Sequence, residues 1–279
     1  MSLLSRNELR VVLNRDQVQL VSYACDLTLK GWTYQIVGKQ ILPCAESADT
    51  PWGNALMTLD TALSELAQKP ACAHVVLSNH FMRYTMVPWS ENLSNDAEEL
   101  AYAKHCFIRA YGADAETWEL LMNHDIAGTA QLACAVDREL LKTLRALFAR
   151  VNVKLKSVQP HLMTAYNNCH ASLKNNDAWL ALFEQGCLCL GFVRQGHWNS
   201  VRTLKVKSDW LEKLPEMLDR EVSLSELDSP SDEVFLWAPE HWKASLPKSV
   251  QWKIRMLQPA LHPGVAPQYE ARFAMAMCG

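Results

Sequence analysis

The feature that most constrains this sequence is a duplication in the order of its predicted elements. Near the N-terminus, apolar and alternating runs predict three strands, a helix and a fourth strand, at Glu8–Leu13, Val18–Tyr23, Trp32–Leu42, Pro51–Gln68 and His74–Leu77. The same order recurs about 170 residues later, at Trp179–Phe183, Cys187–Val193, Trp198–Val206, Ser208–Arg220 and Val234–Ala238. A doubled β-β-β-α-β unit predicts two sibling α/β domains that face one cleft.

An insertion interrupts the first copy. His80–Trp89 predicts a strand that ends at a proline, and Ser94 or Asp96 can cap the helix that follows it. Two more strands are predicted at Trp118–Asn123 and Thr129–Val136. We therefore expect a small α/β subdomain over about residues 80–136.

The chain then returns to the first copy. Asp137 predicts the start of an amphipathic helix with the apolar face Leu140, Leu141, Leu144, Leu147 and Phe148. A strand at Val153–Val158 and a helix at Pro160–Ser172 follow, and the polar stretch Lys174–Asp177 marks the best boundary. The predicted domains are residues 1–175, which include the insertion, and residues 176–279.

Composition narrows the class of protein. The chain has 279 residues, 49% hydrophobic and 20% charged, which is typical of a soluble globular protein. Its net charge of −3 argues against a dedicated nucleic-acid binder. Since no run approaches the roughly 20 apolar residues of a membrane span, we expect a cytoplasmic chain, peripheral to a membrane at most through a partner.

The sequence predicts neither a metal site nor a catalytic residue. The nine cysteines are an odd number in mostly apolar contexts, which favours buried free thiols. Cys187 and Cys189 share a strand face and Cys169 and His170 precede them, but a second paired spacing of the kind zinc sites use is missing. Ser78 lacks the Gly-x-Ser-x-Gly context of a nucleophile elbow.

Two longer segments carry a family resemblance. They are VPWSENLSNDAEELAYAKHCFIRAYGADAETWELLM and ACAVDRELLKTLRALFARVNVKLKSVQPHLMTAYN. With the duplication, they resemble the actin-like ATPase superfamily, and within it the PilM, GspL cytoplasmic and MshI-like proteins of pilus and secretion machines. The resemblance implies an α/β, actin-like fold of two ribonuclease H-like β-β-β-α-β units with an inserted small subdomain.

The resemblance also implies where a nucleotide would bind. ATP-binding relatives hold the phosphates on glycine-containing turns, because glycine lets the backbone N–H groups approach the anion. Here the first turn, Leu13–Gln17, has no glycine, and Arg15 stands beside Asp16. The second turn keeps Gly186 but has Glu184 at the position of an aspartate.

Two further positions of that site are altered. Ser157 occupies the crossing-strand position where an aspartate often lies, and Pro239 falls in the adenosine-side turn, where it offers no N–H. We therefore expect Asp16, Glu184 and Gly186 to be vestigial phosphate-turn positions, with no catalytic residue, cofactor or metal.

The function implied by the resemblance is a non-enzymatic scaffold of a type IV pilus or type II secretion-like machine. Its expected partner is the cytoplasmic segment of an inner-membrane protein, with an assembly ATPase and a homodimer as further candidates and nucleic acid excluded. Two alternatives stay open: an ATP-binding relative that uses Asp16, Glu184 and Gly186, and a sugar or acetate kinase-like enzyme. The kinase alternative needs intact phosphate turns and a catalytic carboxylate.

Overall fold

The computed structural model describes residues 6–28, 31–45, 50–66, 69–122, 128–173, 176–225, 231–262 and 264–278. Parts of the predicted boundary at Lys174–Asp177 and of the predicted strand Trp118–Asn123 lie outside these residues. The chain divides into two compact units. Unit 1 contains residues 1–81, 138–168 and 259–279, and unit 2 contains residues 82–137 and 169–258.

Unit 1 is built on a five-stranded sheet in the order β3-β2-β1-β4-β8. Its strands are β1 (Arg6–Leu13), β2 (Gln17–Thr28), β3 (Gly31–Pro43), β4 (Cys72–Leu77) and β8 (Lys154–Pro160). Strand β2 pairs antiparallel with both β1 and β3, whereas β4 runs parallel to both β1 and β8. These are the four strands predicted from the first sequence copy, completed by the strand that follows the insertion.

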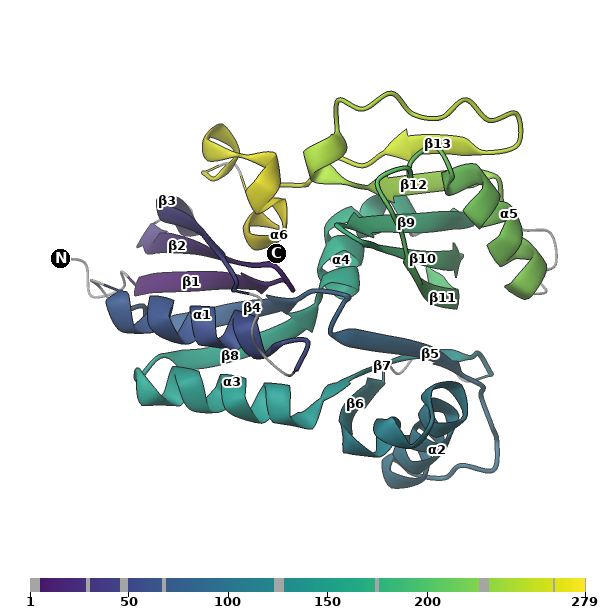
Figure 1. The fold of residues 1–279 in the computed structure, drawn as a ribbon, viewed down its shortest axis with the longest axis horizontal. Helices are drawn as coiled ribbons and strands as arrows, with labels where there is room; N and C mark the ends of the chain where they lie inside the picture. The colour runs from purple at the N-terminus through teal and green to yellow at the C-terminus, as the bar shows by residue number, and fades with distance from the viewer. Residues whose placement is uncertain are drawn as a thin grey trace. The chain divides into compact units, whose positions relative to one another are not determined.

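Helices α1 (Gly53–Glu65) and α3 (Arg138–Arg150) cover one face of this sheet (Figure 1). Alternation along β1 directs Leu9, Val11 and Leu13 to one face, and all three are fully buried. The apolar face predicted for α3 is confirmed: Leu140, Leu141, Leu144 and Phe148 are buried and Leu147 is half-buried. Burial of these two stripes fixes the helices on the sheet.

The C-terminal tail packs on the other face of the same sheet. It contains η3 (Ala266–Gln268), η4 (Ala271–Phe273) and α6 (Ala274–Met277). The tail contributes Val265, Phe273, Ala276 and Met277 to a core that also holds Val12, Val21, Tyr23, Cys25, Ile36 and Val76. The Tyr23 hydroxyl donates to the Ala276 carbonyl at 3.2 Å. The sequence division assigned residues 259–279 to the second domain; their apolar side chains are buried against the first sheet instead.

Unit 2 contains two sheets. The larger has the order β11-β10-β9-β12-β13, from β9 (Ala178–Glu184), β10 (Cys187–Arg194), β11 (His197–Lys205), β12 (Glu233–Trp237) and β13 (Lys253–Met256). It repeats the β-β-β-α-β order with α5 (Leu214–Ser225). Its core includes Trp179, Phe192, Trp210 and Leu218. The helix predicted from Ser208 begins at Leu214, after a turn that carries Trp210 into this core.

The smaller sheet forms the predicted insertion. It has the order β5-β7-β6, from β5 (Met82–Val87), β6 (Trp118–Met122) and β7 (Gln131–Asp137), with α2 (Asp96–Tyr111) and η1 (Ala113–Thr117) beside it. The remaining elements are α4 (His161–Leu173), whose residues fall in both units, and η2 (Pro239–His241).

The start of α2 differs from the prediction by one residue. Asn95, rather than Ser94 or Asp96, is the N-cap, and its Oδ1 accepts from the Ala97 and Glu98 N–H groups at 3.1 Å each. Glu98 in turn accepts from the Ser94 N–H at 2.8 Å. These bonds satisfy N–H groups that the first helical turn leaves without a helical partner.

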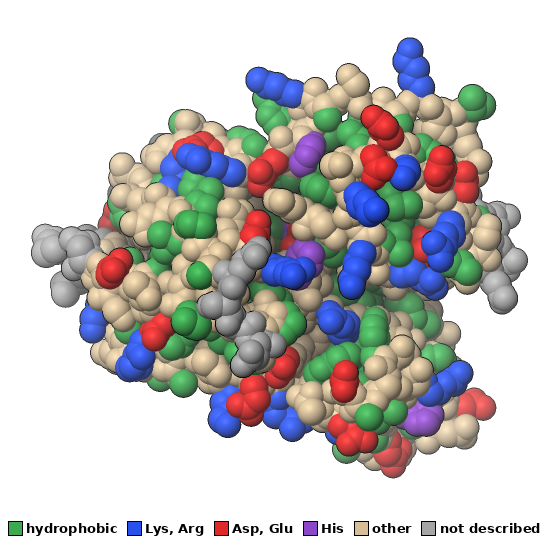
Figure 2. Space-filling view, viewed as in Figure 1, with side chains coloured by type: hydrophobic (Ala, Val, Ile, Leu, Met, Phe, Trp, Pro, Cys, Tyr) green, Lys and Arg blue, Asp and Glu red, His purple; other side chains and the backbone are tan. Residues whose placement is uncertain are grey.

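The distribution of surface charge and the composition of the helices can be compared with what the sequence predicted. On the face drawn in Figure 2, acidic and basic side chains alternate over the surface, in line with the net charge of −3. Among the residues that the structure describes, no helix has the length and apolar composition needed to cross a membrane.

Candidate functional site

An open cavity of about 820 Å³ lies within unit 1. Its floor is the face of the first sheet opposite α1 and α3, and its walls come from α4 and the C-terminal tail. Polar floor residues include Glu8, Arg10, His74 and Ser157, and Tyr23 lies beside them. The sheet face therefore changes from apolar, under the tail core, to polar in the cavity.

Strand register explains why these side chains meet. In the parallel β1–β4 pair, Glu8 lies opposite Cys72 and Arg10 lies opposite His74. Because side chains alternate along a strand, Glu8 and Arg10 share a face with Cys72 and His74. Ser157 lies opposite His74 in the β4–β8 pair, next to a register shift between Ala73 and His74.

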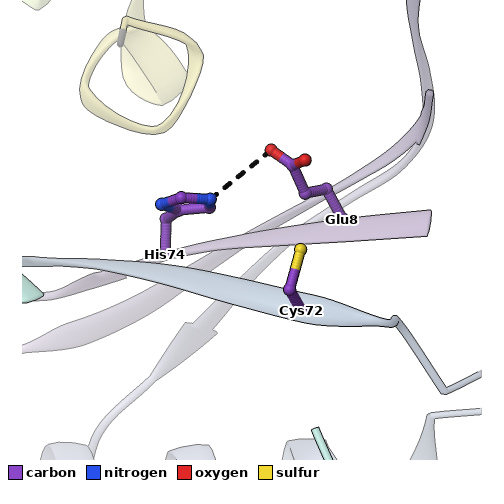
Figure 3. A group of neighbouring side chains, drawn as sticks. All are labelled: Glu8, Cys72 and His74. Atoms are coloured by element: carbon purple, nitrogen blue, oxygen red, sulfur yellow. Dashed lines mark ion pairs between the residues drawn. The ribbon is translucent and has the colours of Figure 1, made fainter. Parts of the chain in front are cut away.

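Glu8, Cys72 and His74 form a cluster at the cavity floor (Figure 3). Their nearest ligand atoms, one from each side chain, all lie within 4.8 Å of one another. The Glu8 Oε1 and His74 Nε2 atoms are 3.6 Å apart. The Glu8 side chain is only 6% exposed and that of His74 is 33% exposed, so the carboxylate is buried while the imidazole reaches the cavity.

Hydrogen bonds orient two members of this cluster. His74 Nδ1 lies 2.7 Å from the Ser157 Oγ, which leaves Nε2 directed toward Glu8. On the other side, the buried Cys25 thiol donates to the Glu8 Oε2 at 3.9 Å. Ser157 and Cys25 therefore hold the outer atoms of the two side chains, His74 Nδ1 and Glu8 Oε2, while His74 Nε2 and Glu8 Oε1 face each other.

Arg10 and Tyr23 form the neighbouring part of the floor. The Arg10 guanidinium lies over the Tyr23 ring, 4.9 Å from its centroid, which is the geometry of a cation–π contact. Burial raises the pKa of Tyr23 to about 12, with the Arg10 charge acting in the opposite direction. Tyr23 is thus a neutral hydrogen-bond donor at physiological pH.

The tail is fixed over this floor by specific contacts. The Asn168 side chain of α4 donates to the Ala260 carbonyl and accepts from the Ala260 N–H, both at 2.8 Å. The rings of Tyr34 and His262 meet edge to face at 5.1 Å. A Cβ at Gly264 would lie 2.5 Å from the Tyr34 carbonyl oxygen, so this close approach of tail to β3 requires glycine.

The first phosphate turn expected from the sequence is a short hairpin loop in unit 1. The Asn14 N–H donates to the Gln17 carbonyl at 3.0 Å, and the Cys44 N–H donates to the Asp16 carbonyl at 2.8 Å. The Arg15 and Asp16 side chains are exposed. One backbone amide of this turn is therefore already used to close the hairpin.

The second turn is a two-residue hairpin loop between β9 and β10 in unit 2. Gly186 has φ +78°, which the turn itself requires, and its carbonyl accepts from the Val206 N–H at 3.1 Å. Glu184 is half-buried and lies opposite Cys187 in the hairpin. Asp16 belongs to unit 1, whereas Glu184 and Gly186 belong to unit 2, and of these three positions none lines the cavity.

Aromatic side chains fill the end of the second sheet near the adenosine-side turn. Phe183, at the end of β9, stacks on Trp210 with ring centroids 3.9 Å apart. His241 packs edge to face on both rings, at 4.9 Å from Phe183 and 5.6 Å from Trp210. Pro239 begins the 3₁₀ helix that carries His241 into this position.

Sequence reasoning missed the Glu8–Cys72–His74 cluster. It began the fourth strand at His74, which left Cys72 outside it, and it assigned no role to Glu8. The available signal was the Cys-x-His spacing, which directs both side chains to one face of a strand. Of the other candidates, Ser78 is buried, and Cys187 and Cys189 are buried free thiols.

The arrangement of the strands and helices defines the fold class of this chain. Two sheets of the same strand order, each with a β-β-β-α-β core, and a small inserted sheet form the actin-like ATPase fold predicted from the sequence. No protein-family model matches the chain, and no curated protein matches its sequence. The fold is therefore established by solved structures.

Three of the solved structures that match nearly the whole chain are compared in turn. The PilM–PilN type IV pilus biogenesis complex matches with a TM-score of 0.65 and 13% identity, over 96% of this chain and 96% of that chain. The cytoplasmic domain of EpsL, an inner-membrane component of the Vibrio cholerae type II secretion system, matches with a TM-score of 0.58 and 12% identity, over 96% and 92%. A Bacteroides thetaiotaomicron protein with an actin-like ATPase fold and unknown function has a TM-score of 0.57 and 11% identity, over 98% and 96%. At identities this low, the matches show a shared fold, and the function of this chain has to be argued from the residues of its own sites.

Proposed function

We propose that this chain is a non-catalytic, actin-like scaffold that binds the cytoplasmic segment of an inner-membrane protein in a type IV pilus or type II secretion-like machine. The observation that carries the proposal is the match to the PilM–PilN complex over 96% of both chains. The match to the EpsL cytoplasmic domain supports the same setting, since EpsL is an inner-membrane component of a secretion system.

The nucleotide turns support a role without ATP. The first turn lacks glycine, and its Asn14 N–H already donates to the Gln17 carbonyl within the hairpin. Pro239, in the adenosine-side turn, has no N–H to donate. Each lost hydrogen bond to a charged phosphate removes about 1.5–3 kcal/mol, whereas micromolar affinity amounts to about 8 kcal/mol in total. Gly186 does not argue for the ATP-binding alternative, because a two-residue hairpin of this geometry needs glycine in any case.

The partner is tested by affinity capture from native membranes with the chain as bait. Recovery of an inner-membrane pilus or secretion protein is expected, and a synthetic peptide of its cytoplasmic segment should then bind the purified chain in a one-to-one complex. A capture that yields no component of either machine, or a peptide that does not bind, contradicts the scaffold role.

The absence of nucleotide binding is tested separately by calorimetric titration with Mg-ATP. We expect no binding with a Kd below about 10 μM. Binding tighter than this, together with a thermal shift that is lost in Glu184→Ala, would establish the ATP-binding alternative.

A further inference from the structure

The floor of the unit 1 cavity brings a carboxylate, a thiol and an imidazole together. The geometry points to a binding site for a zinc-class divalent cation formed by Glu8, Cys72 and His74. Carboxylate oxygen, thiolate sulfur and imidazole nitrogen are the three ligand types that zinc takes from proteins. This inference does not depend on the scaffold role.

The distances suit a tetrahedral ion. With zinc bonds of about 2.0–2.3 Å to N, O and S, neighbouring ligand atoms lie roughly 3.3–3.8 Å apart. Glu8 Oε1 and His74 Nε2 are already 3.6 Å apart, and the Cys72 sulfur lies within 4.8 Å of the other two ligand atoms. Side-chain rotations that move these atoms by about 1 Å would complete the triangle without a change in the strands.

Charge balance favours a divalent cation at this depth. Cys72 is 2% exposed and Glu8 is 5% exposed, so a bound ion would be shielded from water on the sheet side. On binding, the Cys72 thiol loses its proton to solvent, and the thiolate and the Glu8 carboxylate together neutralise the two charges of the ion. Arg10 and Lys156 also line the cavity, so both anionic ligands are needed to make the site attractive to a cation.

The surrounding contacts are those of a supported metal site. The Ser157 hydroxyl holds His74 Nδ1 at 2.7 Å and leaves Nε2 for the ion, as outer-shell partners of metal-bound histidines do. Cys25 holds the second oxygen of Glu8. With three protein ligands, the fourth position is open on the cavity side, where water or an anionic ligand can complete the coordination.

The test uses the tag-free full chain, freed of metal with a chelator and kept reduced. Zn²⁺ titration by calorimetry should give one site with a Kd below about 10 μM. Co²⁺ in place of Zn²⁺ should give the thiolate charge-transfer and visible bands of a tetrahedral sulfur-ligated site. Cys72→Ala and His74→Ala should each weaken Zn²⁺ binding at least tenfold, and Cys72→Ala should abolish the thiolate band.

Control variants distinguish the loss of a metal ligand from a general loss of folded structure. His105→Ala and Cys106→Ala remove the same two side-chain types from α2, and both should keep full affinity. Ser157→Ala retains all three ligands and should weaken binding by about tenfold to a hundredfold. A parent Kd above 10 μM, or unchanged affinity in folded Cys72→Ala or His74→Ala protein, overturns the assignment.

Discussion

Replacement of Phe273 by alanine tests whether the C-terminal tail is an integral part of unit 1. Phe273 is 2% exposed in the core between the tail and the first sheet. Removal of a buried phenylalanine side chain costs about 3–5 kcal/mol, because the lost transfer energy adds to the energy of the cavity that remains. We expect Phe273→Ala to lower the free energy of unfolding by this amount.

The expected change in Tm follows from the size of the cooperative unit. For unit 1 alone, of roughly 130 residues, an unfolding entropy of about 2.1 cal/mol/K per residue gives a decrease of about 11–18 °C. If all 279 residues unfold together, the decrease is about 5–9 °C. Scanning calorimetry measures both the Tm and the unfolding enthalpy, and therefore identifies which unit melts.

The control is Val37→Ala, on an exposed position of β3 in the same unit, which should change the free energy of unfolding by less than about 0.5 kcal/mol. A Phe273→Ala shift below about 2 °C, equal to that of the control, would refute the docking of the tail and with it the tail wall of the cavity.

Three further predictions concern single positions. Gly191→Ala should destabilise unit 2 by about 1–3 kcal/mol in urea unfolding, since a new Cβ would lie 2.4 Å from the Trp198 ring; unchanged stability would contradict this packing. Asn95→Ala should cost about 1 kcal/mol through the lost cap of α2, and Asn95→Asp should restore most of it in the same assay. Hydrogen bonds from the Lys39 and Arg272 side chains, helped by their charges, lower the pKa of Glu270 from 4.5. Its contribution to stability is therefore present above pH 4.5 and is lost as pH falls below it; Glu270→Gln should flatten this part of the Tm–pH curve, and an unaltered curve would count against the pairing.

Elements with strong periodicity were predictable from the sequence. The α3 helix was predicted correctly, together with its buried stripe, because its large apolar residues recur at helical spacing and its charged residues fall on the opposite face. The β-β-β-α-β order of elements along the chain was predicted in both units, because the duplication shows it twice. In contrast, β13 was not predicted, since its four residues, Lys253–Met256, alternate between exposed and half-buried positions at the sheet edge.

The placement of the tail was beyond sequence reasoning for a different reason. Apolar residues such as Phe273 and Met277 indicate that the segment is buried, but they do not say against which sheet. That choice depends on contacts between residues more than 200 positions apart, such as the bond from the Tyr23 hydroxyl to the Ala276 carbonyl. Propensity and periodicity describe local structure and carry no information on such pairings.

The Glu8–Cys72–His74 cluster was hidden by the same limitation. Glu8 and Cys72 become neighbours only through the register of a parallel strand pair, and the short patterns that identify zinc sites describe ligands close in sequence. The sequence prediction of no metal considered pairs of that kind alone. Cys187 and Cys189, the most suggestive pair in the sequence, are buried in the core of β10.

Comparison of the two sibling sheets shows that the fold does not require this polar cluster. On the face of the second sheet that points away from α5, β9 and β10 carry Leu180, Leu182 and Cys189, all fully buried. A buried carboxylate such as Glu8 is costly unless hydrogen bonds or charges compensate it. Since the same strand order is stable with an apolar face, the carboxylate, thiol and imidazole of unit 1 are a property of this cavity rather than of the architecture. Their presence on a face that could be apolar argues that the cavity binds a ligand, and the Zn²⁺ titration tests the first candidate.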